Sequence, residues 1–159
     1  MEARKDKENY YLDIAETVLE RSTCLRRHYG AIIVLNDEII ATGYNGAPRG
    51  RKNCFDLETC LRDDLGIPNF ERYELCRSVH AESNAIISAS RRDMIGATLY
   101  LSGRDAKTGE LLEDTMSCFM CRRLIINSGI VKTVCRTGPD EFVVTHTRDW
   151  VFNDDSLAK

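Results

Sequence analysis

The chain has 159 residues, of which 43% are hydrophobic and 30% charged, with a formal net charge of -3 and a pI of about 5.7. This is the length of one domain with one sizeable core. The acidic balance disfavours a broad polyanion-binding surface, so we expect no nucleic-acid polymer as a partner, although a small phosphate pocket remains compatible with it. We expect a single domain over residues 1–159, with residues 137–159 as a C-terminal extension that has an acidic end.

The sequence carries no signal for a membrane. No apolar run approaches the roughly 18–20 residues that span a bilayer, and the charged N-terminus lacks the apolar core of a signal peptide. We therefore expect no membrane partner and a cytoplasmic location.

Hydrophobic periodicity and turn residues predict the order of the elements. They are a helix over 8–22, a polar turn over 22–30, a hairpin of strands over 31–35 and 38–43, an irregular loop over 43–50, an aperiodic segment over 51–79, a helix over 80–93, a strand over 97–101, a turn-rich excursion over 103–109, a helix over 118–128 closed by Gly129, and strands over 130–135 and 142–145. This order predicts a three-layer α/β/α sandwich with a mixed sheet, beside which two helix starts meet.

Metal-ligand residues stand at both of these helix starts. His80, Cys118 and Cys121 supply one imidazole and two thiolates, which makes three zinc ligands and leaves the fourth tetrahedral position open. The spacing Cys-x-x-Cys is one helical turn, and a helix N-terminus stabilises thiolate over thiol. Glu82 lies two residues after His80, close enough to shuttle the proton of a zinc-activated water without being a ligand. A structural zinc is the alternative, but structural sites usually have four protein ligands, so we favour a catalytic zinc.

These motifs carry a family resemblance. It rests on Arg27 followed by Gly30-Ala31-Ile32-Ile33-Val34, on Gly43-Tyr44-Asn45-Gly46-Ala47-Pro48, on His80-Ala81-Glu82-Ser83-Asn84-Ala85-Ile86 and on Cys118-x-x-Cys121. His-x-Glu with Cys-x-x-Cys is the pattern of zinc-dependent nucleobase deaminases. From about residue 8 to about residue 136, the chain resembles the deoxycytidylate (dCMP) deaminases of the cytidine-deaminase-like superfamily. One departure is Ser117, where the family usually has proline, and we expect this serine to cap the second site helix.

The resemblance implies a zinc hydrolase that converts dCMP to dUMP and ammonia, which supplies dUMP for thymidylate synthesis. Glu82 would act as the general acid and base, the Ala81 amide would bond the base, and Asn45 is our candidate for the deoxyribose hydroxyl. A 5′-phosphate needs cations or N–H groups, for which Arg26, Arg27 and Arg49 are candidates. The candidates for an aromatic that stacks on the base are Tyr44, Phe119 and Trp150.

Four further cysteines suggest a second metal. Cys24, Cys54, Cys60 and Cys76 provide the thiolates for a closed structural zinc that would pin the 51–79 segment, and several members of the family carry an extra zinc in this region. The alternative is four buried free thiols. Cys135 lies in a predicted strand and is expected in the core.

The resemblance also implies regulation and assembly. We expect activation by dCTP and inhibition by dTTP, with Mg²⁺, at a nucleotide loop formed by Gly43, Tyr44, Asn45 and Gly46. The family is often oligomeric, and we expect a homo-oligomer, specifically a hexamer. The competing readings are a deaminase of cytidine, deoxycytidine, guanine or tRNA adenosine, and a catalytically silent regulator that binds zinc or nucleotide.

Overall fold

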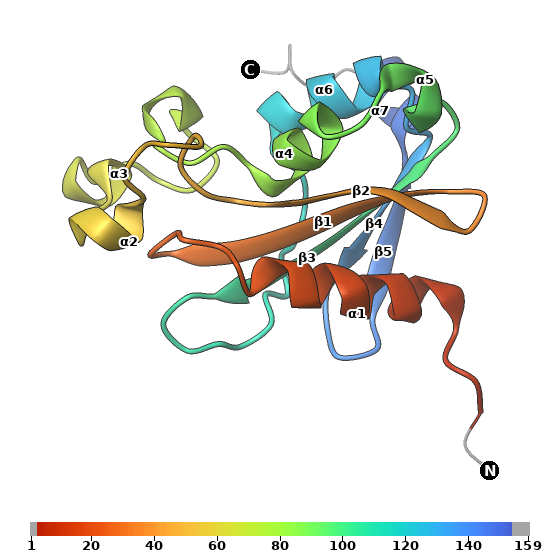
Figure 1. The fold of residues 1–159 in the computed structure, drawn as a ribbon, viewed down its shortest axis with the longest axis horizontal. Coiled ribbons are helices and arrows are strands. Elements are labelled where there is room, and N and C mark those ends of the chain that lie inside the picture. Colours follow the sequence, from red (N-terminus) through yellow and green to blue (C-terminus); the bar gives the residue numbers. More distant parts are fainter. Residues whose placement is uncertain (1–2, 154–159) are drawn as a thin grey trace.

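The computed structural model describes residues 3–153, which fold around one five-stranded sheet (Figure 1). The strands are β1 (Arg27–Leu35), β2 (Glu38–Tyr44), β3 (Thr98–Asp105), β4 (Lys132–Arg136) and β5 (Phe142–His146). The helices are α1 (Lys7–Leu19), α2 (Cys54–Leu57), α3 (Leu61–Asp64), the 3-10 helix η1 (Tyr73–Leu75), α4 (Ala81–Ile87), α5 (Arg91–Met94), α6 (Phe119–Ser128) and α7 (Thr147–Phe152). Within the described residues, no helix is both long and apolar enough to cross a membrane.

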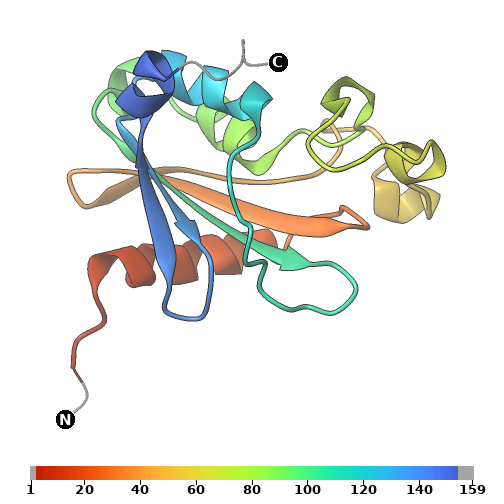
Figure 2. The same cartoon turned by 180° about the vertical axis from the view of Figure 1, so that it is seen from behind.

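The sheet is mixed, and helices cover both of its faces. Its strands lie in the order β2-β1-β3-β4-β5, with β3 and β4 parallel and the other neighbouring pairs antiparallel. Helix α1 covers one face, whereas α4, α5, α6 and α7 lie on the other side (Figures 1 and 2). This arrangement confirms the predicted three-layer α/β/α sandwich.

The apolar run in β1 fills two cores because alternate side chains of a strand point to opposite faces. Ile32 and Val34 belong to the cluster beneath α1, and Ala31 and Ile33 belong to the cluster beneath the opposite helices. Burial on both faces explains why this strand is continuously apolar rather than alternating.

Two glycines let helices approach the sheet closely. A Cβ added at Gly30 of β1 would lie 2.0 Å from the Ala15 carbonyl oxygen of α1. A Cβ added at Gly43 of β2 would lie 2.3 Å from the Ala81 carbonyl oxygen of α4. Gly43, which the sequence predicted to belong to a nucleotide loop, therefore also sets how closely α4 packs on the sheet.

Several predicted boundaries were wrong. The second half of the predicted polar turn over 22–30 is strand, because Arg27 and His28 pair in register with Asp105 and Arg104. That pairing also extends β3 into the predicted excursion over 103–109. The helix predicted over 80–93 ends at Ile87. A separate helix, α5, follows it because the Ser90 hydroxyl accepts a hydrogen bond from the Arg92 amide and caps a new start.

The ends of the chain and the long irregular segment also differ from expectation. Helix α1 ends at residue 19 rather than 22, and α7 directly after β5 was not predicted. The aperiodic segment 51–79 contains α2, α3 and η1. Strand β5 lies within the predicted extension over 137–159 and pairs with β4. The acidic end of that extension, residues 154–159, lies outside the described residues.

Candidate metal centre and substrate cavity

Three potential metal ligands converge where the N-termini of α4 and α6 meet. His80 is the N-cap residue of α4 and Cys118 is the N-cap residue of α6. The Nδ1 atom of His80 lies 3.4 Å from the sulfur of Cys118 and 3.4 Å from the sulfur of Cys121. In the part of the chain that the structure describes, this is the one group of three or more candidate ligands whose donor atoms come this close together, all within 4.8 Å. The geometry therefore brings the sequence-predicted ligands together.

The donor set fits zinc, which favours imidazole and thiolate ligands. Hydrogen bonding with Cys121, opposed by burial, lowers the pKa of Cys118 to about 4. Burial lowers the pKa of His80, but its hydrogen bonds with the Cys118 and Cys76 sulfurs outweigh that effect and raise this pKa to about 10. Hydrogen bonding with Cys118, together with burial, raises the pKa of Cys121. The three donors thus share protons that a bound cation would displace.

Ser117 does not cap the second site helix, so this prediction was wrong. The cap is Cys118, whose sulfur accepts a hydrogen bond from the Cys121 amide at 3.5 Å. Ser117 lies one residue earlier and is buried, and its carbonyl oxygen accepts a hydrogen bond from Arg122. The helix therefore starts without proline or serine at its cap because the ligand itself fills that role.

Glu82 lies in the first turn of α4 and lines a cavity of about 100 Å³ next to the ligands. Its side chain is buried, with 5% of the residue exposed, and burial raises the pKa of the carboxyl group. A carboxyl group with a raised pKa can both accept and return a proton near neutral pH. Ala81 precedes it as the first residue of the helix and is fully buried.

Asn45 also lines this cavity, but most of its hydrogen bonds are structural. Its Oδ1 atom accepts from the Tyr29 amide at 2.8 Å and from the Ser22 hydroxyl at 2.5 Å. Its Nδ2 atom donates to the Arg27 carbonyl oxygen at 2.8 Å. An amide NH₂ group carries two hydrogens, so Asn45 braces the start of β1 with one and has a second to offer.

The two adjacent arginines reach the cavity and the third candidate does not. Arg26 pairs with Asp63 through Nε at 3.0 Å, while its buried Nη1 has no hydrogen-bond partner among the described residues. Arg27 pairs with Asp114 at 3.2 Å. Arg49 instead lines a second, larger cavity. Both candidates therefore line the first cavity, together with Arg62 and Arg77, and the buried Nη1 of Arg26 is an unused donor.

The aromatic wall of the cavity comes from residues that the sequence analysis missed. Tyr44, Phe119 and Trp150 are not among the side chains that line the cavity, whereas Tyr29, Phe70 and Tyr73 are. The ring of Tyr73 meets the ring of His80 edge to face, with centroids 4.8 Å apart. Phe70 and Tyr73 lie in the aperiodic 51–79 segment, where no hydrophobic pattern indicates which side chains point inward.

Four of the five remaining cysteines border the same cavity. They are Cys24, Cys54, Cys60 and Cys76. Burial raises the pKa of the Cys54 thiol, and the charges of the other three thiols add to this effect. Their sulfurs do not form a group as close as the one around His80. Cys135 is buried in the core on β4, as expected, and burial raises its pKa to about 12.

The second cavity, of about 720 Å³, lies along the predicted nucleotide loop. Gly43, Tyr44 and Gly46 line it. Three arginines border it as well, namely Arg21, Arg49 and Arg51. Asn45 points away from it to the first cavity, which separates this residue from the other members of the loop.

Residues 5–137 match the family described as the cytidine and deoxycytidylate deaminase zinc-binding region. The chain belongs to this family. It is 37% identical over 137 residues to a deoxycytidylate deaminase of Mycobacterium phage D29, an alignment that covers 83% of this chain and 95% of the phage protein. It is 35% identical over 133 residues to the deoxycytidylate deaminase of Saccharomyces cerevisiae, which covers 82% of this chain but only 38% of the yeast protein.

A solved structure shows the same fold. The chain superposes on the apo dCMP deaminase of cyanophage S-TIM5 with a TM-score of 0.58 and 26% identity, over 84% of this chain and 85% of the phage chain. Family membership and this fold confirm the resemblance that the motifs indicated.

Proposed function

We propose that this chain is a zinc hydrolase that deaminates dCMP to dUMP and ammonia. The observation that carries the proposal is the group of His80, Cys118 and Cys121, which leaves one zinc position open beside the buried carboxyl group of Glu82. Likeness to the phage D29 deoxycytidylate deaminase over nearly its whole length supports the choice of substrate.

The side chains of the cavity account for the proton transfers. A zinc ion on the three donors supplies activation of water near neutral pH. Glu82 accepts a proton from the water whose oxygen adds to C4 of cytosine, and it delivers a proton to N3. Glu82 then takes the remaining proton from the new C4 hydroxyl and passes it to the 4-amino group, which leaves as ammonia while the C4 carbonyl forms. The Ala81 amide would bond the base, and the second Nδ2 hydrogen of Asn45 would donate to the deoxyribose hydroxyl.

Arg26 and Arg27 are the proposed contacts for the 5′-phosphate. Both line the cavity, and the unpartnered Nη1 of Arg26 is a donor ready for an anionic oxygen. Its bonds to Asp63 and Asn69 hold the guanidinium in place, so the arginine would lose little side-chain freedom on binding.

An absorbance assay of zinc-loaded protein on dCMP, CMP and deoxycytidine tests the proposal, with Glu82→Gln as the matched variant. We expect loss of cytosine absorbance with dCMP, and its abolition in Glu82→Gln without loss of bound zinc. Turnover of deoxycytidine in preference to dCMP would indicate a nucleoside deaminase. Absence of turnover on all three, with zinc bound, would favour the silent regulator.

The second cavity is the proposed site of regulation by dCTP and dTTP with Mg²⁺. Its three arginines suit a triphosphate. Equilibrium dialysis with radiolabelled dCTP, repeated for Arg49→Gln, tests this, and equal affinity in both proteins would contradict it. Assembly as a homo-oligomer, specifically a hexamer, remains a prediction for light scattering.

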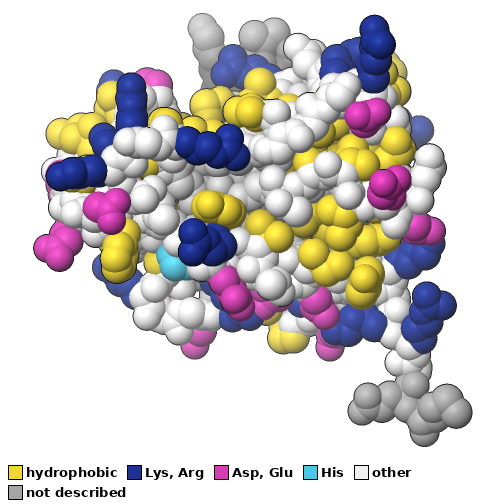
Figure 3. All heavy atoms as spheres, viewed as in Figure 1, with side chains coloured by type: hydrophobic (Ala, Val, Ile, Leu, Met, Phe, Trp, Pro, Cys, Tyr) yellow, Lys and Arg dark blue, Asp and Glu magenta, His cyan; other side chains and the backbone are white. Residues whose placement is uncertain are grey.

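A second, structural zinc held by Cys24, Cys54, Cys60 and Cys76 is also proposed, because all four border one cavity. Two zinc ions per chain by elemental analysis would support it and one would refute it. The cysteines form no disulfide in the structure, which fits the predicted cytoplasmic location. On the face that Figure 3 shows, acidic side chains are interspersed with basic ones, which supports a small nucleotide rather than a nucleic-acid polymer as the partner.

A further inference from the structure

The segment between α2 and α4 is built around one buried arginine. Arg62 of α3 is 5% exposed and donates through Nη2 to the carbonyl oxygens of Pro68, at 2.6 Å, and Glu71, at 2.8 Å. These bonds close the turn over 68–72. Two residues of that turn, Phe70 (φ 68°) and Arg72 (φ 51°), have left-handed backbone conformations. Such conformations cost free energy without glycine and persist where the surroundings fix them.

The same arginine holds Tyr73. Its guanidinium lies over the Tyr73 ring, 4.4 Å from the centroid. The Tyr73 hydroxyl accepts a hydrogen bond from the Phe70 amide at 3.1 Å. Tyr73 is thus fixed on its face by a cation–π contact and at its tip by the turn that Arg62 closes.

Tyr73 in turn contacts the histidine of the metal centre. The two rings meet at 85°, with centroids 4.8 Å apart, which is a favourable edge-to-face arrangement. The imidazole of His80 must keep one ring orientation for Nδ1 to face both cysteine sulfurs. The helix backbone does not fix rotation of the His80 ring about its Cβ–Cγ bond, so the side chains that contact the ring, Tyr73 and Cys76 among them, set its orientation.

We infer that Tyr73, clamped by Arg62, is a positioning residue that orients the His80 ring for metal binding. The inference rests on the proposed zinc site. Groups that orient metal ligands typically change metal affinity by about 10- to 100-fold when removed. Because Arg62 and Tyr73 lie outside the metal-binding motifs, zinc affinity should depend on residues that those motifs do not include.

The test is zinc affinity, measured by competition with a chromophoric chelator, together with the visible spectrum of the cobalt(II)-loaded protein. Tyr73→Leu should weaken zinc binding by about tenfold or more and alter the cobalt spectrum, whereas Tyr73→Phe keeps the ring and loses only the hydroxyl contact, so it should weaken binding less than Tyr73→Leu. The matched control is Tyr10→Leu, which removes an edge-to-face tyrosine contact on α1, with Tyr11 at 5.1 Å, and should leave both readouts unchanged. Thermal unfolding of the metal-free proteins checks that each variant folds.

The route through Arg62 has its own test. Arg62→Lys should weaken zinc binding in the native background and add no further loss in the Tyr73→Leu background, since the two residues act in series. Unchanged affinity and cobalt spectrum in folded Tyr73→Leu would overturn the inference while the proposed zinc site stood. A native protein that binds no zinc would instead overturn the proposed function.

Discussion

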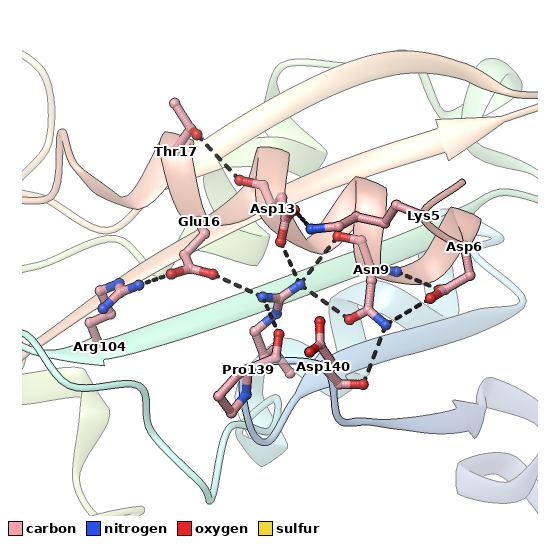
Figure 4. Close-up of polar contacts among 10 residues, drawn as sticks. Lys5, Asp6, Asn9, Asp13, Glu16, Thr17, Arg104, Pro139 and Asp140 are labelled. Carbon is pink, nitrogen blue, oxygen red and sulfur yellow. Dashed lines mark hydrogen bonds and ion pairs between the residues drawn. The ribbon is translucent and has the colours of Figure 1, made fainter. Parts of the chain in front are cut away.

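Arg136 at the end of β4 ties α1 to the sheet, and its replacement should be the most destabilising polar substitution on that face. Only 4% of its side chain is exposed. It pairs with Asp13 at 2.8 Å and with Glu16 at 3.1 Å, and it donates to the Pro139 and Asn9 carbonyl oxygens at 3.0 and 3.2 Å (Figure 4). With the Asn9 Oδ1 atom at 3.4 Å, five acceptor atoms therefore converge on one guanidinium from α1 and from the turn after β4.

The magnitude follows from what Arg136→Met leaves behind. Removal of one partner of a buried ion pair costs about 3–5 kcal/mol. In this variant Glu16 would remain paired with Arg104. Asp13, whose side chain is 42% exposed, would remain paired with Lys5. We therefore expect a loss of stability at the lower end of this range, about 3 kcal/mol. Asp13→Asn removes a far more exposed partner and should cost about 1 kcal/mol or less.

Urea unfolding of the zinc-loaded proteins, followed by circular dichroism, measures both values. The midpoint should fall while the slope with denaturant stays constant, because the surface exposed on unfolding is unchanged. A loss below about 1 kcal/mol for Arg136→Met, or a larger loss for Asp13→Asn than for Arg136→Met, would refute the reasoning.

The pH dependence of stability gives a second readout of the same network. Burial raises the pKa of Asp13, but hydrogen bonds from Lys5 and Arg136 outweigh it and lower this pKa from its ordinary value of 3.8. A lowered pKa means that the contribution is present above pH 3.8 and is lost as the pH falls through the folded-state value. Native protein should therefore lose stability below about pH 4 more steeply than Arg136→Met does.

Three further predictions concern the site. Gly43→Ala should cost about 1–3 kcal/mol of stability and lower turnover, because the added methyl group meets the backbone of α4, which carries Glu82. Melting and absorbance assays measure the two effects, and a variant as stable and active as the native protein would contradict this prediction. Arg26→Gln should raise KM for dCMP by about 10- to 100-fold without affecting any turnover of deoxycytidine, and an equal effect on both substrates would exclude a phosphate contact. Removal of zinc with a chelator should lower the unfolding temperature and zinc addition should restore it, so a temperature that does not respond would argue against a bound metal.

The sequence predicted that the donor atoms of His80, Cys118 and Cys121 would come together, and the structure brings them together, because the spacing within each motif is local. Cys118 and Cys121 are one helical turn apart, and His80 and Glu82 flank a helix start, so spacing alone places each pair. The meeting of the two helix starts required the fold, which followed from the order of strands and helices. The pairing that extends β1 back to Arg27 could not be predicted from the sequence, because the neighbouring strand β3 supplies those backbone hydrogen bonds.

The aromatic side chains that line the first cavity could not be predicted either, because tertiary contacts rather than a local sequence pattern place them. Tyr73 and Arg62 lie in a segment without a period, and turn carbonyls and a cation–π contact hold them rather than an apolar face. Asn45 was identified as a functional residue, yet two backbone groups of β1 take up much of its amide. A sequence motif identifies a candidate residue, whereas the hydrogen-bond partners of that residue depend on tertiary contacts.

The contact between β2 and α4 joins the two cavities. Gly46 exchanges backbone hydrogen bonds with Val79, at 3.2 and 2.8 Å, and Val79 directly precedes His80. The Asn84 side chain donates to the Tyr44 carbonyl oxygen at 2.8 Å. Val79 and Asn84 line the second cavity, whereas His80 and Glu82 line the first. Since the short segment over 79–84 carries all four, a ligand that displaces the loop over 43–46 has to strain these bonds or move His80 with it.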